Sequence, residues 1–479
     1  MKKLDYFLIA IVLLIALTFR FYKINIPLAD FHSWRQADTA SVARNFVKNG
    51  FNLLHPKYDD LSNIQSGKEN PQGYRMVEFP IYNAIFGFLY KNFSFFSLEI
   101  WGRLTSIIFS LIIIAIIYYL LTKEVSRVAG FFASFIYAVF PFFVFYSRVI
   151  LPENTALGFS MLSILFLYLL KNKKNNQFSN FIKYFLSAIL FAISLLIKPT
   201  TIFFIFPIIY LFYKNYKWSF YKKIGFYLYF LISFLPLVLW RQYINQFSEG
   251  IPVNQWLLTS VNTDQGLQKI FFKPAFFRWI FFERINNLIL GGYLTGFFIL
   301  GMLTKQKNYF FFSFLISSLT YLFIFQGGNI QHEYYQILIF PMLTIFSGLG
   351  INFFVNNINK LLNPLIFYPA LVIIIIFSWL FSFYQVKNYY NYSFDLIQQA
   401  NIIKSLTDPQ DKIITDKTGD TTLLYLSDRK GAPAIYKDPE ELKKLGYQYL
   451  ITENKDQINI LKNKYQTVFK NNKFIIFKL

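Results

Sequence analysis

The chain has 479 residues, of which 55% are hydrophobic and only 15% charged, and its mean hydropathy is +0.38. A soluble protein would carry roughly a quarter charged residues, so this composition excludes an ordinary soluble enzyme and indicates a polytopic membrane protein. The net charge of +22 is carried largely by short loops between apolar stretches, which indicates topology and lipid headgroup contact rather than nucleic-acid binding. Cysteine is absent, which excludes disulfides, thiol catalysis and cysteine-ligated metals.

Apolar stretches occupy most of the chain up to residue 384. A spanning helix needs about 20 mostly apolar residues, and about eleven stretches meet this need. We expect the first to be retained as a span, because no small-residue cleavage site precedes Pro27. The predicted spans are 6–22, 101–121, 129–146, 155–170, 181–197, 201–213, 224–240, 287–303, 309–325, 335–354 and 364–383.

The loops between these spans predict the orientation of the chain. Lys-rich, acid-poor loops such as 2–3, 214–223 and 305–307 are typical of the cytoplasmic side. We therefore expect a multi-pass protein of the plasma (inner) membrane with a cytoplasmic amino terminus. The loop 25–82 and the carboxyl-terminal tail then lie on the outer face.

From about residue 385 the sequence changes to soluble character. Helical patterns are predicted at 394–405, 438–445 and 455–465, and strands at 412–416, 447–452 and in a pair within 468–478. This alternation predicts a small α/β domain, 385–479, with a partly parallel sheet. It has no Gly-rich phosphate loop, so we expect it to pack over or gate a site formed with the membrane domain, 1–384.

The loop 25–82 holds more ionisable residues than a connector between helices needs. Asp30 follows the first span, and Asp38 lies in a predicted helix, 37–47. Either carboxylate could accept a proton from an incoming hydroxyl or amine as a general base. Arg35 and Arg44 are expected to pair with Asp38 and keep it ionised. Alternatively, Asp38 only caps or pairs on an exposed helix face.

The same loop contains a dense set of hydrogen-bond donors, His32, Trp34, Arg35 and Gln36. The forked donors of Arg suit a phosphate, and the Trp face can support a sugar or a prenyl chain. His and Gln can bond to sugar hydroxyls. Trp at a membrane interface is, however, often only an anchor, so this alternative stays open for Trp34.

Glu78 precedes a predicted amphipathic helix, 81–93, which we expect to lie along the outer interface. Its carboxylate is interpreted either as a charge at the helix terminus or as a second acid facing Asp30. The sequence does not favour one of these roles over the other.

Charged and aromatic residues also border the later spans. Arg148 and Glu153 stand in one short outer turn, where they either face a cavity or pair with each other. Lys198 stands at a break between two spans and is suited to a donor phosphate, or it only extends to the headgroups. His332 and Tyr334 begin another span and are candidate ligands of the donor sugar or phosphate.

A metal site is only weakly indicated. The three His residues stand far apart, at 32, 55 and 332, and Zn²⁺ would need more ligands than they offer. The sequence requires no cofactor. A divalent metal held by Asp30, Asp38 or Glu78 stays open.

These motifs together resemble the GT-C class of polytopic glycosyltransferases, and within it the bacterial branch related to dolichyl-phosphate-mannose protein mannosyltransferases and the lipid A aminoarabinose transferase. The resemblance is carried by Asp30-Phe-His-Ser-Trp-Arg-Gln-Ala-Asp, Glu78-Phe-Pro-Ile-Tyr, residues 148–153, Lys198-Pro199 and His332-Glu-Tyr-Tyr. It implies that the donor is a polyprenyl-phosphate sugar, that the transfer inverts the anomeric carbon, and that Asp30 is the base, with Asp38 as the substitute. In that class Asp-Glu commonly stands where this chain has Trp34-Arg35-Gln36.

The expected function is therefore an inverting hexosyl- or pentosyltransferase of the cell envelope, with mannosyltransferase-like character and a lipid, glycan or protein acceptor on the outer side. Two other classes stay open. A transporter or flippase of lipid-linked saccharides would also present cations and aromatic residues, but it is expected to carry ionisable residues within its spans. A ligase of lipid-linked saccharides would have a similar membrane form.

Overall fold

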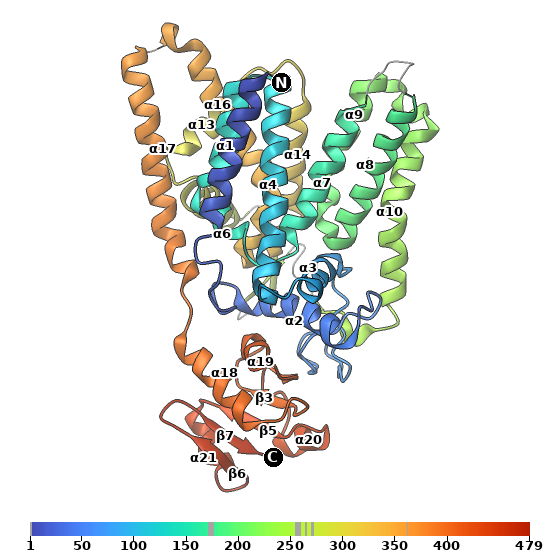
Figure 1. Cartoon of the computed structure of the whole chain (residues 1–479), viewed down its shortest axis with the longest axis vertical. Helices are drawn as coiled ribbons and strands as arrows, with labels where there is room; N and C mark the ends of the chain where they lie inside the picture. Colours follow the sequence, from blue (N-terminus) through green and yellow to red (C-terminus); the bar gives the residue numbers. More distant parts are fainter. Residues whose placement is uncertain (1, 171–176, 254–259, 264–265, 270–272, 362) are drawn as a thin grey trace. The chain divides into compact units, whose positions relative to one another are not determined.

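The computed structural model describes residues 2–170, 177–253, 260–263, 266–269, 273–361 and 363–479. The described chain is mostly helical (Figure 1). It divides into two compact units, each built from three segments. The first unit contains residues 1–24, 103–240 and 254–389, and the second contains 25–102, 241–253 and 390–479. The segment 25–102, called the loop segment below, therefore belongs to one unit with residues 390–479 of the carboxyl-terminal domain.

The first unit is a bundle of apolar helices. α7 packs against α8, α13 against α16, and α5 against both α1 and α16. Its longer helices are α1 (Lys3–Arg20), α4 (Leu98–Glu124, from residue 103), α5 (Arg127–Val139), α7 (Glu153–Tyr168), α8 (Gln177–Ile197), α9 (Ile205–Tyr216), α10 (Ile224–Ile244, to residue 240), α13 (Leu294–Leu303), α14 (Phe310–Ile324), α16 (Phe340–Leu361) and α17 (Pro364–Val386). The shorter elements are α6 (Pro141–Tyr146), η2 (Pro199–Phe204), η3 (Lys217–Lys222), α12 (Pro274–Phe277), the π-helix η5 (Arg278–Ile289), α15 (Gln326–Gln331), η6 (Glu333–Ile339), η7 (Lys387–Tyr390) and the hairpin of β1 (Ser260–Thr263) and β2 (Gly266–Lys269).

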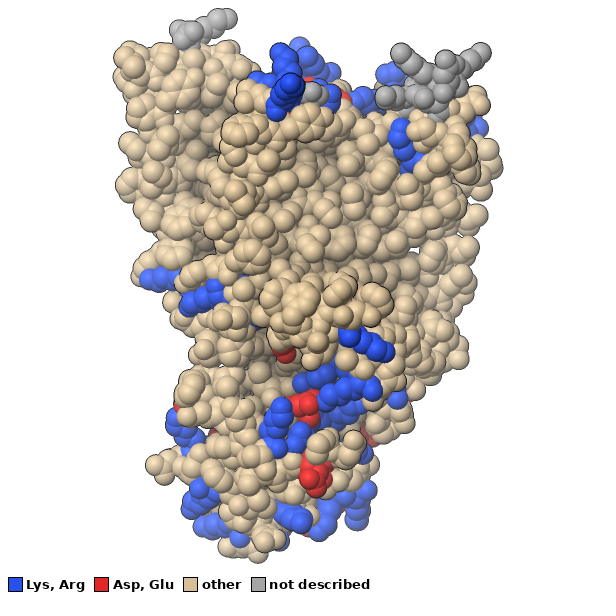
Figure 2. Space-filling model, in the orientation of Figure 1, with Lys and Arg blue, Asp and Glu red and all other residues tan. Residues whose placement is uncertain are grey.

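Several of these helices are suited to a membrane. Among the described residues, five helices are long and apolar enough to cross a bilayer, or six if one bent pair counts as a single span. On the face drawn in Figure 2, the middle of the bundle shows few charged residues, and Lys and Arg lie at the end near the amino terminus. The outward faces of α10 and α17 expose large apolar side chains, including Leu231, Leu235, Ile373 and Phe377. The count of about eleven spans stays a prediction.

Two predicted spans are broken, and the sequence contains the cause of each break. The stretch 129–146 forms two helices, because Phe140 is extended with ψ 135° before Pro141, and a residue before Pro is disfavoured in the α conformation. The stretch 287–303 bends by 119° where Gly291 and Gly292 have φ of +62° and +76°. Residues with a Cβ rarely adopt such angles.

Small residues allow a very close contact between α13 and α16. A Cβ added to Gly301 of α13 would lie 1.8 Å from the carbonyl oxygen of Phe346, and one added to Gly350 of α16 would lie 1.8 Å from that of Phe297. Any side chain at these two positions would push the helices apart. Such small-residue contacts are typical of helix packing in membranes, where van der Waals contact replaces hydrophobic burial as the driving force.

The second unit contains a five-stranded sheet in the order β4-β3-β5-β7-β6. β3 pairs in parallel with β4 and β5, and the other two pairings are antiparallel, so the predicted partly parallel α/β domain is confirmed. The strands are β3 (Ile413–Thr415), β4 (Gly431–Ala432), β5 (Tyr449–Thr452), β6 (Gln466–Lys470) and β7 (Ile475–Lys478). The helices are α18 (Phe394–Leu406), α19 (Thr422–Ser427), α20 (Pro439–Lys444) and α21 (Lys455–Leu461).

The loop segment extends this sheet. It supplies α2 (Ser33–Asn49) and α3 (Ile81–Asn92), and the second segment, 241–253, adds η4 (Ser248–Gly250). Asp60 forms a parallel bridge with Gly431. The Leu61 amide donates to the Gly431 carbonyl at 2.7 Å, and the Gly431 amide donates to the Asp59 carbonyl at 2.9 Å. The loop thus covers the β4 edge of the sheet, and α19 packs against α2.

Candidate active site

Asp30 lies in the turn before α2 and its side chain is only 2% exposed. The Gln36 amide, on the first turns of α2, donates to Asp30 Oδ1 at 2.8 Å and to the Phe31 carbonyl at 3.1 Å. Between them, His32 has a φ of +58°, a left-handed conformation that costs a non-Gly residue roughly 1–2 kcal/mol. The chain therefore accepts strain at the turn into α2, where the Gln36 amide helps to orient the carboxylate of Asp30.

Asp38 is held from both sides. Arg75 Nη2 lies 2.9 Å from Asp38 Oδ2, and Thr421 Oγ1 donates to Asp38 Oδ1 at 2.8 Å. The same hydroxyl lies 3.2 Å from the Trp34 carbonyl, and Thr422 donates to Ser33 Oγ at 2.9 Å. The prediction that Arg35 and Arg44 are the partners of Asp38 is wrong. The cation comes instead from residue 75, and the carboxyl-terminal domain contacts α2 through Asp38.

Arg35 pairs with Glu78. One guanidinium nitrogen, Nη2, donates to both carboxylate oxygens, at 2.9 and 2.7 Å. Glu78 precedes α3, whose N-cap is Pro80, so Glu78 is not the first residue of that helix. A cavity of only about 20 Å³ lies among Arg35, Asp38, Arg75 and Glu78. That volume is about enough for one water molecule.

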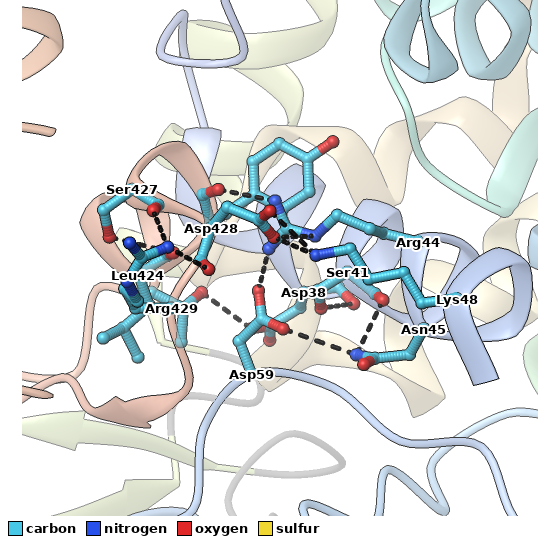
Figure 3. A network of polar contacts seen from close by, with 12 residues as sticks. Asp38, Ser41, Arg44, Asn45, Lys48, Asp59, Leu424, Ser427, Asp428 and Arg429 are labelled. Carbon is cyan, nitrogen blue, oxygen red and sulfur yellow. Dashed lines mark hydrogen bonds and ion pairs between the residues drawn. The ribbon is translucent and has the colours of Figure 1, made fainter. Parts of the chain in front are cut away.

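A second network links α2 to the carboxyl-terminal domain (Figure 3). Arg44 pairs with Asp59 and with Asp428, donates to the Tyr425 carbonyl at 2.7 Å, and lies over the Tyr425 ring. Burial disfavours the charged guanidinium, but Asp59, Tyr425 and Asp428 together outweigh burial, and the pKa of Arg44 is raised. Lys48 donates to both oxygens of Asp428 from the exposed side. The network therefore holds the middle of α2 on α19.

Asp60 is buried where the loop joins the sheet. Its Oδ1 accepts hydrogen bonds from the Ser62 amide at 2.8 Å and the Ser62 hydroxyl at 2.6 Å. Burial raises the pKa of this carboxyl to about 7, although the Ser62 hydrogen bonds act in the opposite direction. A group that changes charge near neutral pH therefore lies at the contact between the loop and the carboxyl-terminal domain.

In the first unit, Glu153 begins α7 and is fully buried. Its Oε1 lies 2.7 Å from Lys198 Nζ. Lys198 is extended, with φ −148° and ψ 101°, and stands at the break before Pro199 that separates α8 from η2. Among the described residues, Glu153 Oε2 has no hydrogen-bond partner. The alternative in which Glu153 pairs with Arg148 is wrong, because its partner is Lys198.

An aromatic group borders this ion pair. Lys198 Nζ lies 5.2 Å from the centre of the Tyr335 ring. Tyr335 contacts Tyr334, and Tyr334 stacks on His332 with ring centres 5.2 Å apart and a 9° angle between the planes. Arg148 is fully buried and donates to the Lys23 carbonyl at 3.0 Å. The first unit therefore brings Glu153, Lys198 and the turn at His332 together.

Metal ligands are not grouped in the part of the chain that the structure describes: no three His, Asp or Glu side chains there could hold one ion. Asp38 and Glu78 each carry an Arg partner.

Arg75 and Thr421 were not predicted as site residues. The sequence contains no local signal for them, because each reaches α2 from a distant segment.

The helix bundle of the first unit and the sheet-bearing second unit match the fold of GT-C glycosyltransferases. Residues 80–240 match the model of the dolichyl-phosphate-mannose-protein mannosyltransferase family. ArnT from Cupriavidus metallidurans, solved bound to undecaprenyl phosphate, is 11% identical with a TM-score of 0.66, and the match covers 98% of this chain and 97% of that one. The archaeal oligosaccharyltransferase AglB from Archaeoglobus fulgidus, solved with an inhibitory peptide and a dolichol-phosphate, is 12% identical with a TM-score of 0.62 over 94% and 69%. No curated protein matches the sequence.

Proposed function

We propose that this protein is an inverting glycosyltransferase that transfers a sugar from a polyprenyl-phosphate carrier to an acceptor outside the cytoplasm. The observation that carries the proposal is the buried Asp30 carboxylate, oriented by the Gln36 amide within a GT-C fold. The lipid phosphates bound by ArnT and AglB support a donor of this kind. The enzyme would lie in the plasma membrane, with the outer loop and carboxyl-terminal domain outside the cytoplasm.

Asp30 is proposed as the general base. Its carboxylate takes the proton of the acceptor hydroxyl or amine as the acceptor atom bonds to the anomeric carbon from the face opposite the phosphate. The bond from that carbon to the phosphate oxygen breaks, and the polyprenyl phosphate leaves with the electron pair. Asp38 is the substitute for this role, and Arg75 and Thr421 hold its two oxygens.

Cations are proposed to stabilise the leaving phosphate. Lys198 is nine-tenths buried and held by Glu153 and the Tyr335 ring, so its ammonium group is fixed before the donor binds. Arg35 and Arg148 are further candidates. Charge that develops on the phosphate in the transition state is stabilised most effectively by donors that need no rearrangement.

The test is transfer of a radiolabelled sugar from a polyprenyl-phosphate donor by the full chain in liposomes. Asp30→Asn keeps the shape and removes the base, so transfer should fall by about 100-fold or more. Asp456→Asn is the matched control, because Asp456 is an exposed carboxylate on α21. Sugar transfer should fall less in Asp38→Asn than in Asp30→Asn.

Two outcomes would contradict the proposal. Full transfer by Asp30→Asn would show that Asp30 is not the general base. Movement of the intact lipid-linked sugar across the bilayer, with no new glycosidic bond, would indicate a flippase instead.

A further inference from the structure

A cavity separate from the candidate active site lies in the second unit, at the carboxyl-terminal end of α2. Its volume is about 580 Å³, within the range of pockets that hold small ligands. Residues from the end of α2, from the segment after it and from the carboxyl-terminal domain line it, including Asn49, His55, Lys57, Tyr74 and Lys430. None of these residues was assigned a role above.

The charges around this cavity do not balance. Two lysines line it, Lys57 and Lys430. The carboxylates of Asp59 and Asp428 are already paired with Arg44 and Lys48. Lys57 donates to the neutral Gln72 oxygen at 2.8 Å. Among the described residues, neither Lys57 nor Lys430 forms an ion pair. Two positive charges therefore face the cavity without a carboxylate partner.

Lys430 is held in an unfavourable place for a cation. Burial lowers the pKa of its ammonium group, and Lys57, Lys48 and Arg44 lower it further, against the opposite effect of Asp59. Lys430 is half-buried, and a charge that loses contact with water is normally retained with a partner. An anion bound in the cavity would relieve both the burial and the repulsion between the lysines, so Lys430 is better suited to a ligand than to stability.

The remaining walls suit a saccharide. Asn45, Asn49 and Asn52 present side-chain amides, which can both donate to and accept from hydroxyl groups. The Tyr74 ring lies among His55, Phe247 and Lys57 and offers an apolar face. His55 is fixed through both ring nitrogens, to Asn52 at 3.3 Å and to the Tyr243 hydroxyl at 3.0 Å. Cations, amides and an aromatic face thus meet in one cavity.

We propose that this cavity binds a phosphorylated saccharide, with Lys57 and Lys430 holding the phosphate and the amides and Tyr74 holding the sugar. A phosphate monoester carries about −1.5 to −2 charges at neutral pH, which matches the two lysines. The ligand is either a free sugar phosphate or the phosphorylated sugar headgroup of a lipid. The site does not depend on the transfer reaction proposed above, and binding alone tests it.

The experiment measures binding to the full chain in nanodiscs by calorimetry. The probes are glucose 6-phosphate, glucose and inorganic phosphate, and a second series uses nanodiscs that contain phosphatidylinositol 4-phosphate. Glucose 6-phosphate should bind more tightly than glucose or phosphate alone. Lys57→Gln and Lys430→Gln should each weaken binding about tenfold, the effect of losing one charge-assisted hydrogen bond.

Lys462→Gln, an exposed lysine after α21, is the matched control and should not change binding. Lys430→Gln should unfold at or above the wild-type temperature, since it removes a crowded charge, and Lys430→Arg should keep the affinity. Lysine-dependent binding of only the lipid probe supports the proposal and identifies a lipid headgroup. Binding of neither probe, or binding that both Gln variants retain, overturns it.

Discussion

The buried carboxyl of Asp60 predicts how firmly the loop segment stays on the sheet as the pH changes. The pKa of this group is about 7 in the folded chain, against 3.8 for the ordinary group. Between these two pH values, the folded state therefore binds a proton that the unfolded state has released. Because stability falls with rising pH wherever the folded state binds more protons, Asp60 stabilises the loop progressively less from about pH 3.8 upward, and the loss levels off above pH 7.

The magnitude follows from the proton occupancy. Around a pKa of about 7, the folded carboxyl is roughly nine-tenths protonated at pH 6 and one-tenth at pH 8. The unfolded carboxyl is ionised at both values. The difference in bound protons between the two states, integrated from pH 6 to pH 8, is about 1. This corresponds to about 1.4 kcal/mol of stability lost over that range. Asp60→Asn should abolish this loss, because an amide keeps the acceptor for Ser62 and carries no charge.

Amide hydrogen exchange measures the effect where it acts. The amides of Leu61 and Gly431 donate across the contact between loop and sheet, and their protection reports how often the contact opens. After correction for the intrinsic exchange rate, protection should fall about tenfold from pH 6 to pH 8 in the wild type and stay constant in Asp60→Asn. Asp456→Asn serves as the control. An equal fall in Asp60→Asn, or a rise with pH in the wild type, would refute the reasoning.

Three further variants test individual contacts. Glu153→Gln leaves the buried Lys198 without its partner and should cost about 3–5 kcal/mol, whereas the double variant with Lys198→Met should recover most of that loss in thermal unfolding; equal additive losses would contradict the ion pair. Thr421→Val should weaken the contact with Asp38 by about 1.5–3 kcal/mol and increase proteolysis of the loop, while Thr421→Ser should behave as the wild type. Lys48→Gln, at an exposed pair, should change stability by at most about 1 kcal/mol, and a larger loss would show that the exposed end of the network matters.

The local pattern of the sequence predicts the carboxyl-terminal domain well. Periodicity and capping residues are local signals, and α18, α20, α21, β3 and β5 form where these signals stand. The helix α19 and the strand β4 were missed. β4 has only two residues, too few to show a pattern, and it exists because Ile413 pairs with Gly431 on one side and Asp60 on the other.

The same difference between local signals and distant contacts applies to the candidate site residues. The sequence identifies Asp30, Glu153 and Lys198 as candidates because each stands at the end of an apolar stretch. It does not identify their partners, since Lys198 meets Glu153 and Arg75 meets Asp38 only after distant segments pack. The two broken spans were predictable in principle, because Pro141 and Gly291-Gly292 are visible in the sequence and have known effects on a helix.

The three-segment build of the second unit has a consequence for biogenesis. Arg44 and its acceptor, the Tyr425 carbonyl, are separated by 381 residues, and at about 5–20 residues per second a ribosome needs roughly 20–80 s to supply that length. The loop segment is thus synthesised well before the sheet that it joins. Until synthesis reaches the strands, this segment lacks the partner that covers it, and such incomplete surfaces are exposed to aggregation and need chaperones.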